Sequence, residues 1–467
     1  MTAIDGSTAD TEPGWFHHVF HHGLVAAVVA SLVGVLHFVG YLGWLDATIL
    51  RLLGTSTAAS SGTVPANLPH VLLIGPGLYE TAFRQTSPLD RAQLAQLVET
   101  ILKARPALLA IDLDLSPSSD GPDAGQTALF EALSKAAAAG TKVVFTLPFR
   151  VVNPSLRAAK FKWLKELCAV PGVDVASADL VTHSGTVLMF DDQSPSVGVV
   201  AHRALTKGSD GGHGLCGQLV QAGGEWADLL LAPAFLESFR YSVGFGSSLK
   251  NFNAGFFSHA HELRHELTSV GALPSNASGM PLNLQGQTVF LGSGFNPSDK
   301  FELPLATASG VADGVEVHAA IQSSLRSPVP EVNGAAAFLI DIIVGIAAAS
   351  FFDLVWGIQR RQHHRWRQHG NLVNYLGTHG LWAVNLVLLL LAVLGLVVVA
   401  RKLFIPGNLW INPGPIVIGV YIKFMLARRD PSHDNGIANS RAATMWIERS
   451  AVILIVAAGV ATVVLHH

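Results

Sequence analysis

Polar and apolar positions follow two alternating patterns between residues 70 and 150. Continuous apolar runs are typical of strands covered on both faces, and they occur in HVLLIGPG at 70–77, ALLAIDLDLS at 107–116 and KVVFTLPF at 142–149. Between them, LDRAQLAQLVETILKA at 89–104 and TALFEALSKAAAAG at 127–140 place leucines and alanines at helical spacing. The order βαβαβ predicts an α/β fold with a doubly wound, mainly parallel sheet.

The same patterns continue toward residue 330. LRAAKFKWLKEL at 156–167 has the spacing of a further helix, and the glycine-rich segment at 205–225 is typical of a surface loop. QTVFLGSG at 287–294 is a further buried-strand pattern, and VEVHAAIQSSL at 315–325 is a helical one. We therefore expect one globular domain over residues 65–330.

Long apolar stretches flank this domain. Residues 24–45 carry no charge and are long enough to cross a bilayer as a helix, and a cleaved signal peptide is disfavoured because residues 1–23 lack Lys and Arg. We expect a cytoplasmic tail at 1–23 and α-helical transmembrane segments, about five in number. After the first, they are predicted at 335–357, 380–400, 413–427 and 450–465.

Arginines between the predicted spans set the orientation. QRRQHHRWRQHG, at 359–370, directly follows the second predicted span, and the positive-inside rule assigns such a segment to the cytoplasm. A second arginine-containing stretch at 428–449 is predicted on the same side. The domain at 65–330 is then expected outside, in the periplasm, on a multi-pass protein of a bacterial cell inner membrane.

Composition agrees with a membrane protein. Half of the 467 residues are hydrophobic and 13% are charged, against about 25% in soluble proteins. The formal net charge of -3 predicts no nucleic-acid partner. The two cysteines, Cys168 and Cys216, fit no zinc or redox motif, which leaves a disulfide or two buried thiols, and an oxidising compartment favours the disulfide.

The carboxyl ends of the predicted strands contain polar and small residues. In parallel sheets ligands bind at this edge, which makes Asp112, Asp114, Asp299 and Gly292 candidate ligand-binding residues. Asp112 and Asp114 are two residues apart on a strand, so their carboxylates are expected on one face, where a cation or a hydroxyl-rich ligand could bind. The alternative for Asp114 is a capping role in the turn that follows.

HELRHE at 261–266 contains the H-E-x-x-H spacing of zinc peptidases, with His261, His265 and Glu262 as candidate metal ligands. The extended motif would need Gly at 268 and His at 271, where the chain has Thr268 and Gly271. The alternatives are metal binding without catalysis, pH sensing, and a purely structural amphipathic helix over FFSHAHELRHELTSV at 256–270. We expect no cofactor and no enzymatic activity.

The segment from 282 to 325 contains a glycine-containing strand, an Asp-x-Phe-x-x-Pro loop and a Gly-Val-Glu-x-His-Ala helix start. In these motifs it resembles the carboxyl-terminal half of the CHASE type-two domain, an extracellular sensory domain. The resemblance implies a sensor that forms dimers, with one span before the domain and several after it. The matching residues are Gly286, Val289, Gly292, Asp299, Phe301, Pro304, Gly314, Val315, Glu316, His318 and Ala319.

The chain departs from this family in two ways. Gly75-Pro76-Gly77 stands where members commonly have an acidic pair, and a fifth predicted span stands where members continue into a cytoplasmic output domain. We therefore expect a membrane-anchored sensor that signals through a separate membrane or cytoplasmic partner. The alternatives are a non-catalytic scaffold subunit of an envelope complex and, with less support, a zinc hydrolase.

Overall fold

The computed structural model shows a chain that divides into two compact units, one formed by Leu50–Pro330 and one by Met1–Ile49 with Glu331–His467. Within the first unit, the structure describes most of the predicted domain. The described residues are 67–117, 124–146, 154–180, 189–206, 249–275, 280–303 and 311–328, with isolated positions at 182, 187, 216 and 343 and several between 384 and 399.

The domain is built on a six-stranded sheet in which every neighbouring pair of strands is parallel. The strand order is β4-β3-β2-β8-β1-β7, so β8 lies between the two strands that open the chain's βαβ pattern. The predicted parallel α/β sheet is confirmed. Its strands are β1 (His70–Ile74), β2 (Leu108–Asp114), β3 (Lys142–Thr146), β4 (Val173–Ala176), β7 (Arg264–Leu267) and β8 (Thr288–Ser293).

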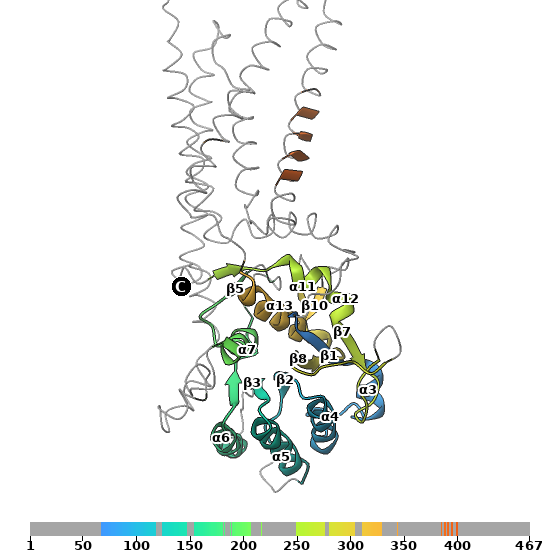
Figure 1. Cartoon of the computed structure of the whole chain (residues 1–467), viewed down its shortest axis with the longest axis vertical. Coiled ribbons are helices and arrows are strands. Elements are labelled where there is room, and N and C mark those ends of the chain that lie inside the picture. Colours follow the sequence, from blue (N-terminus) through green and yellow to red (C-terminus); the bar gives the residue numbers. More distant parts are fainter. Residues whose placement is uncertain are drawn as a thin grey trace, which may run out of the picture. The chain divides into compact units, whose positions relative to one another are not determined.

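Helices cover both faces of this sheet (Figure 1). One face packs against α4 (Arg91–Lys103), α5 (Ala124–Ala138) and α6 (Pro154–Cys168), and the other against α7 (Val197–Thr206) and α13 (Gly314–Arg326). This double cover explains why the central strands are buried along most of their length: all six residues of β8 are buried. At the start of α4, Asp90 is the N-cap residue: its carboxylate accepts hydrogen bonds from the backbone amides of Ala92 and Gln93.

Shorter elements complete the domain. Two antiparallel pairs form outside the main sheet, β5 (Met189–Asp191) with β6 (Leu249–Asn251) and β9 (Lys300–Glu302) with β10 (Val311–Asp313). The remaining short helices are α3 (Pro76–Thr81), α11 (Ala254–Ser258), α12 (Ala260–Leu263) and the 3₁₀ turn η2 (Pro297–Asp299).

The single amphipathic helix expected at 256–270 is wrong. The chain forms α11 and α12, and then leaves the helical conformation at Arg264 to form β7. β7 pairs with β1 in parallel, from Val71 opposite Arg264 to Ile74 opposite Leu267. A helix there would leave the edge of β1 without backbone partners, so tertiary pairing overrides the local helical pattern.

The predicted membrane spans lie outside the described residues, apart from Ile343 and several positions between 384 and 399. Among the described residues, no helix combines the length and the apolar character that crossing a bilayer requires.

Candidate functional site

The helix α13 is the most enclosed helix of the described domain. Every residue from Gly314 to Ser324 is buried, including the polar His318 and Gln322. Two glycines permit this packing. A Cβ at Gly292 of β8 would lie 2.5 Å from the Cβ of Val315, and one at Gly198 of α7 would lie 2.7 Å from the Cβ of Ile321. The candidate Gly292 thus provides room for α13.

Four acidic side chains surround the first turns of α13. Asp112 comes from the end of β2, opposite Gly292 of β8, and Asp299 comes from η2. Asp313 precedes the helix and Glu316 lies in its first turn, where the two form a capping box: the Glu316 carboxylate accepts from the Asp313 amide at 2.8 Å. The sheet edge and the helix start thus meet in one polar region.

Two cations neutralise part of this region. The Asp313 carboxylate, with 2% of its side chain exposed, accepts from Arg264 Nη2 at 3.0 Å and from Lys300 Nζ at 2.7 Å. Arg264 Nε also lies 3.3 Å from Glu316 Oε1. Arg264 therefore ties the edge strand β7 to both members of the capping box, and Lys300 ties β9 to the same helix start.

Asp299 is held over the start of α13. Its Oδ2 accepts a hydrogen bond from Ser293 Oγ at 3.0 Å, and its carboxylate lies against the backbone of Gly314, where a Cβ would collide with it. Burial, with a smaller contribution from Asp313, raises the pKa of Asp299 to about 6, against the opposing effects of Ser293 and Lys300.

Asp112 and His318 face one another in the interior. His318 Nε2 lies 3.9 Å from Asp112 Oδ2, and the two side chains are only 1% and 8% exposed. Burial, and then the charge of Asp299, raises the pKa of Asp112 to about 8. Burial lowers the pKa of His318 to about 4, against an opposing effect of the Ala178 backbone. Within the described part of the chain, neither ring nitrogen has a hydrogen-bond partner of good geometry.

Asp114 does not join Asp112. The pairing of β2 with β3 shifts register between Ile111 and Asp114, which interrupts the regular alternation of side chains. The Asp114 carboxylate instead accepts from the amide and hydroxyl of Ser116 and lies 3.0 Å from Lys160 Nζ of α6. The expected shared face is not formed, and Asp114 has the turn-capping contacts of the alternative interpretation.

The H-E-x-x-H residues are divided between two elements. His261 and Glu262 belong to α12, whereas His265 belongs to β7, so the motif lacks the single helix face on which zinc peptidases place both histidines. Glu262 lies 3.4 Å from His259 Nδ1. In the described ranges, no group of three or more His, Cys, Asp or Glu side chains is arranged to hold a metal ion.

His265 contacts a histidine that the motif does not include. Its Nε2 lies 3.3 Å from Nδ1 of His70 on β1, and the two rings stack with their centroids 5.5 Å apart. Burial lowers the pKa of both, and proximity to His70 also lowers that of His265, to about 4. This neutral pair therefore packs across the β1–β7 edge.

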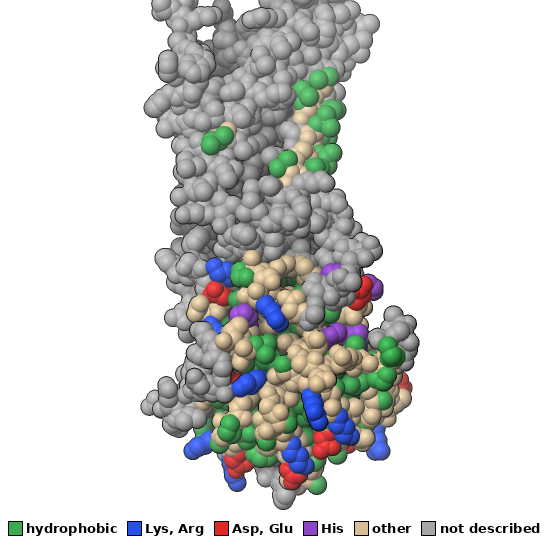
Figure 2. All heavy atoms as spheres, viewed as in Figure 1, with side chains coloured by type: hydrophobic (Ala, Val, Ile, Leu, Met, Phe, Trp, Pro, Cys, Tyr) green, Lys and Arg blue, Asp and Glu red, His purple; other side chains and the backbone are tan. Residues whose placement is uncertain are grey.

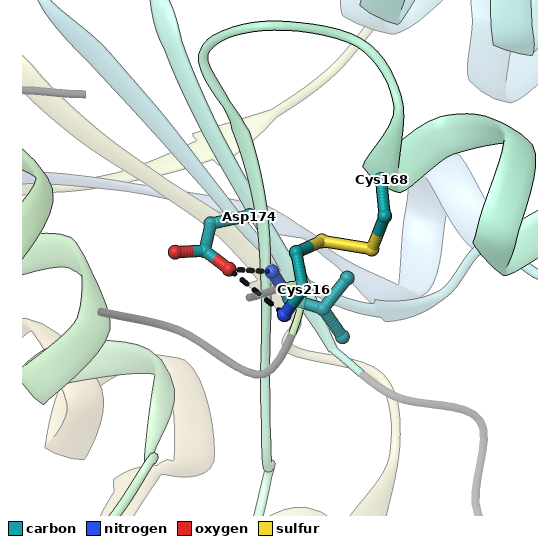
Figure 3. Close-up of a disulfide and its surroundings, with 4 residues drawn as sticks. Cys168, Asp174 and Cys216 are labelled. Atoms are coloured by element: carbon teal, nitrogen blue, oxygen red, sulfur yellow. Dashed lines mark hydrogen bonds between the residues drawn. A yellow bond between two sulfur atoms is a disulfide. The ribbon is translucent and has the colours of Figure 1, made fainter. Parts of the chain in front are cut away.

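Cys168 and Cys216 form a disulfide, one of the two alternatives that the sequence left open. It joins the end of α6 to a segment 48 residues further along the chain, and Figure 3 shows it beside β4. There Asp174 accepts hydrogen bonds from the amides of Cys216, at 3.3 Å, and Val175, at 2.8 Å.

Sequence patterns had not identified Arg264, Lys300 or Asp313 as members of the polar region. The Asp313-x-x-Glu316 spacing is a helix-start signature from which Asp313 could have been identified. Arg264 and Lys300 carry no local signal, because they reach Asp313 only through the pairing of β7 with β1 and of β9 with β10.

Comparison with known protein families gives a match. The family model described as the CHASE2 domain matches residues 27–354, which is more than half of the chain. Comparisons with curated proteins and with solved structures find no match. The resemblance noted at the start of α13 is thereby confirmed, and the chain belongs to the CHASE2 family of extracellular sensory domains.

Proposed function

We propose that the chain is a membrane-anchored sensor of a bacterial inner membrane. Its domain at 65–330 would receive a stimulus in the periplasm, and α13 would carry the resulting change toward the predicted span at 335–357. A separate partner would receive the signal at the arginine-containing segments 358–369 and 428–449. Membership of a sensory family supports the first of these steps.

The contacts of α13 carry the proposal. Its first turn is bonded to the edge strand β7 through Arg264 and to the β9–β10 pair through Lys300, and Asp299 lies directly against Gly314. The helix ends at Arg326, shortly before the predicted span. Since interiors are densely packed, a rearrangement at the strand ends is expected to shift α13 rather than be absorbed locally.

A periplasmic location is supported by the disulfide between Cys168 and Cys216, since disulfides persist in oxidising compartments and are rare in the bacterial cytoplasm. The arginines at 360–367 support the same orientation through the positive-inside rule. These two observations are independent, because one concerns the domain and the other the opposite side of the predicted span.

Membrane anchoring is supported by the described positions between 384 and 399. They are helical, and five of their apolar side chains recur at spacings of three and four residues with 47–58% of their surface exposed. Figure 2 shows them as a stripe of hydrophobic side chains. Such a face is expected to contact lipid. The residues are Val384, Val387, Leu391, Leu394 and Val398.

The orientation is tested by adding one cysteine on each predicted side. Glu131→Cys places a thiol on the exposed face of α5, and Arg365→Cys places one in the arginine-containing segment. A membrane-impermeant maleimide is added to bacterial spheroplasts. We expect it to label Glu131→Cys while the spheroplasts are intact and Arg365→Cys only after they are lysed. The reverse pattern would place the domain in the cytoplasm and refute the proposal.

The partner is tested by crosslinking in cells, detergent purification and mass spectrometry. We expect a cytoplasmic signalling protein with the wild type. Replacing Arg360, Arg361, Arg365 and Arg367 together by Gln should abolish its recovery. The matched control replaces them by Lys, which keeps the positive charge that sets topology. Recovery of periplasmic envelope proteins alone would favour the scaffold function instead.

We propose that the chain itself is not an enzyme. The division of the H-E-x-x-H residues between α12 and β7 supports this, because zinc peptidase chemistry needs them on one helix. Metal analysis of purified wild type and His261→Ala provides the test. Stoichiometric zinc in the wild type that is lost in the variant would reopen the hydrolase hypothesis.

A further inference from the structure

Three titratable side chains lie near one another at the start of α13, and we refer to Asp112, Asp299 and His318 as the acid–imidazole cluster; Asp299 is partly exposed. Asp112 and His318 are almost fully enclosed and 3.9 Å apart, which is too long for a hydrogen bond. Both His318 ring nitrogens lack a well-formed hydrogen bond to any described residue. The polar neighbours of this imidazole are the Ala178 backbone and the Asp112 carboxyl group, and neither forms a hydrogen bond of good geometry with it. Two enclosed ionisable side chains that face one another without a direct hydrogen bond call for a functional explanation.

The cations nearby are engaged with other carboxylates. Lys300 is bonded to Asp313, and Arg264 to Asp313 and Glu316. In the part of the chain that the structure describes, no Lys or Arg lies within ion-pair distance of Asp112, whose one ion-pair contact is His318. Asp112 therefore lacks the cation that would stabilise an ionised carboxylate in the interior.

We propose that the stimulus received by this domain is a change in acidity, and that the acid–imidazole cluster binds and releases the proton. This inference rests on the sensor function proposed above and names its stimulus. A proton fits the site better than a metal ion does, because the described residues contain no group arranged for metal coordination.

The charge of the cluster follows from its environment. With a pKa of about 8 for Asp112, about 6 for Asp299 and about 4 for His318, the cluster near pH 7 holds one protonated carboxyl, one carboxylate and a neutral imidazole. Acidification below about pH 6 neutralises Asp299, and a rise above about pH 8 ionises Asp112. Each step changes the charge of the cluster by one unit.

Both steps act on the start of α13. The Asp299 carboxylate lies against Gly314, where a negative charge is stabilised by the amino-terminal end of the helix dipole and by Lys300. Protonation of Asp299 removes both interactions. Ionisation of Asp112 instead places a second negative charge near that of Asp299 and favours any opening that lets water reach Asp112.

Infrared difference spectroscopy of the purified full chain in detergent tests whether the proton is bound. A protonated carboxylic acid has a carbonyl stretch that a carboxylate lacks. We expect this band at pH 7 in the wild type, its loss as pH rises through about 8, and its absence at pH 7 in Asp112→Asn. Asp114→Asn is the matched control, because Asp114 lies on the same strand but pairs with Lys160, and it should keep the band.

Hydrogen exchange of residues 311–326, corrected for the intrinsic pH dependence of exchange, tests the coupling to α13. Opening that hydrates Asp112 releases one proton, so its equilibrium constant should rise about tenfold between pH 6.5 and 7.5, where Asp112 dominates the cluster. This rise should vanish in Asp112→Asn and persist in Asp114→Asn.

Absence of the carbonyl band from the wild type at pH 7, or identical exchange slopes in the wild type and Asp112→Asn, would overturn the proton site. These measurements need no partner and no membrane orientation. Failure of the labelling or crosslinking experiments would therefore refute the sensor function separately, even if the titration behaved as expected.

Discussion

The contribution of Asp112 to the free energy of folding depends on pH. A carboxyl group with a pKa of about 8 in the folded chain and 3.8 in the unfolded chain favours folding fully below pH 4, and this contribution is lost as pH rises toward 8. His318 has the opposite sign, because a pKa lowered from 6.5 to about 4 favours folding above pH 6.5. Between pH 6.5 and 8, Asp112 therefore dominates among the three cluster residues.

The first prediction concerns this range. From pH 6.5 to 8, the free energy of unfolding of the full chain should fall by about 1.4 kcal/mol per pH unit, the value for one linked proton. Pulse proteolysis in urea measures it. Asp112→Asn should remove this slope, whereas Asp114→Asn should retain it. Equal slopes in all three proteins would show that Asp112 titrates normally.

The second prediction concerns the interaction of the two carboxyl groups. Because the negative charge of Asp299 raises the pKa of Asp112, Asp299→Asn should lower the pH at which the Asp112 carbonyl band disappears. Ser293→Ala should raise the pKa of Asp299, since the Ser293 hydrogen bond lowers it in the wild type. Infrared titration of both variants checks the two directions in one experiment.

Individual site residues could be predicted only where their position in the sheet fixes them. Asp112 and Asp299 were identified because parallel strands end at one edge. Asp114 was grouped with Asp112 by the alternation rule, and a register shift in β2 breaks that rule. Arg264 was missed because its contacts to Asp313 and Glu316 require β7, which the helical pattern of its own segment concealed.

At the scale of elements, α13 depends on glycines in its neighbours. Gly198 lies where α7 crosses α13, and Gly292 lies where β8 passes Val315. The helices and strands themselves were predictable, because continuous apolar runs and helical spacing are local properties. The close crossing was not, since nothing in the sequence near 198 indicates that residues 318–321 lie against it.

The third prediction tests that crossing. Gly198→Ala should destabilise the chain by about 1–3 kcal/mol, because its Cβ would lie 2.7 Å from the Cβ of Ile321 and one helix must shift. Gly77→Ala in α3 is the matched control. Its Cβ meets nothing within 4 Å, and alanine favours helix by about 1 kcal/mol over glycine, so stability should be unchanged or slightly increased. Denaturation in urea measures both, and equal effects would contradict the close packing.

At the scale of the whole molecule, the disulfide links the fold to its compartment. Cys168 and Cys216 are 48 residues apart, and closing such a loop is expected to stabilise the folded chain by about 2–4 kcal/mol. Neither cysteine belongs to the polar region, so its removal should weaken the domain without changing the Asp112 titration. Stability and proton binding can therefore be varied separately in one protein.

The fourth prediction uses this bond as a reporter of location. Rapid alkylation of intact bacterial cells, followed by mass analysis of the purified chain, should show no modified thiol before reduction and two after it. Cys168→Ser should show one reactive thiol, lower the free energy of unfolding by about 2–4 kcal/mol and keep the infrared band of Asp112. Two reactive thiols in wild-type cells would place the domain in a reducing compartment, because a formed disulfide does not react with the alkylating agent. Such a result would contradict a periplasmic sensor whatever the outcome of the proton measurements.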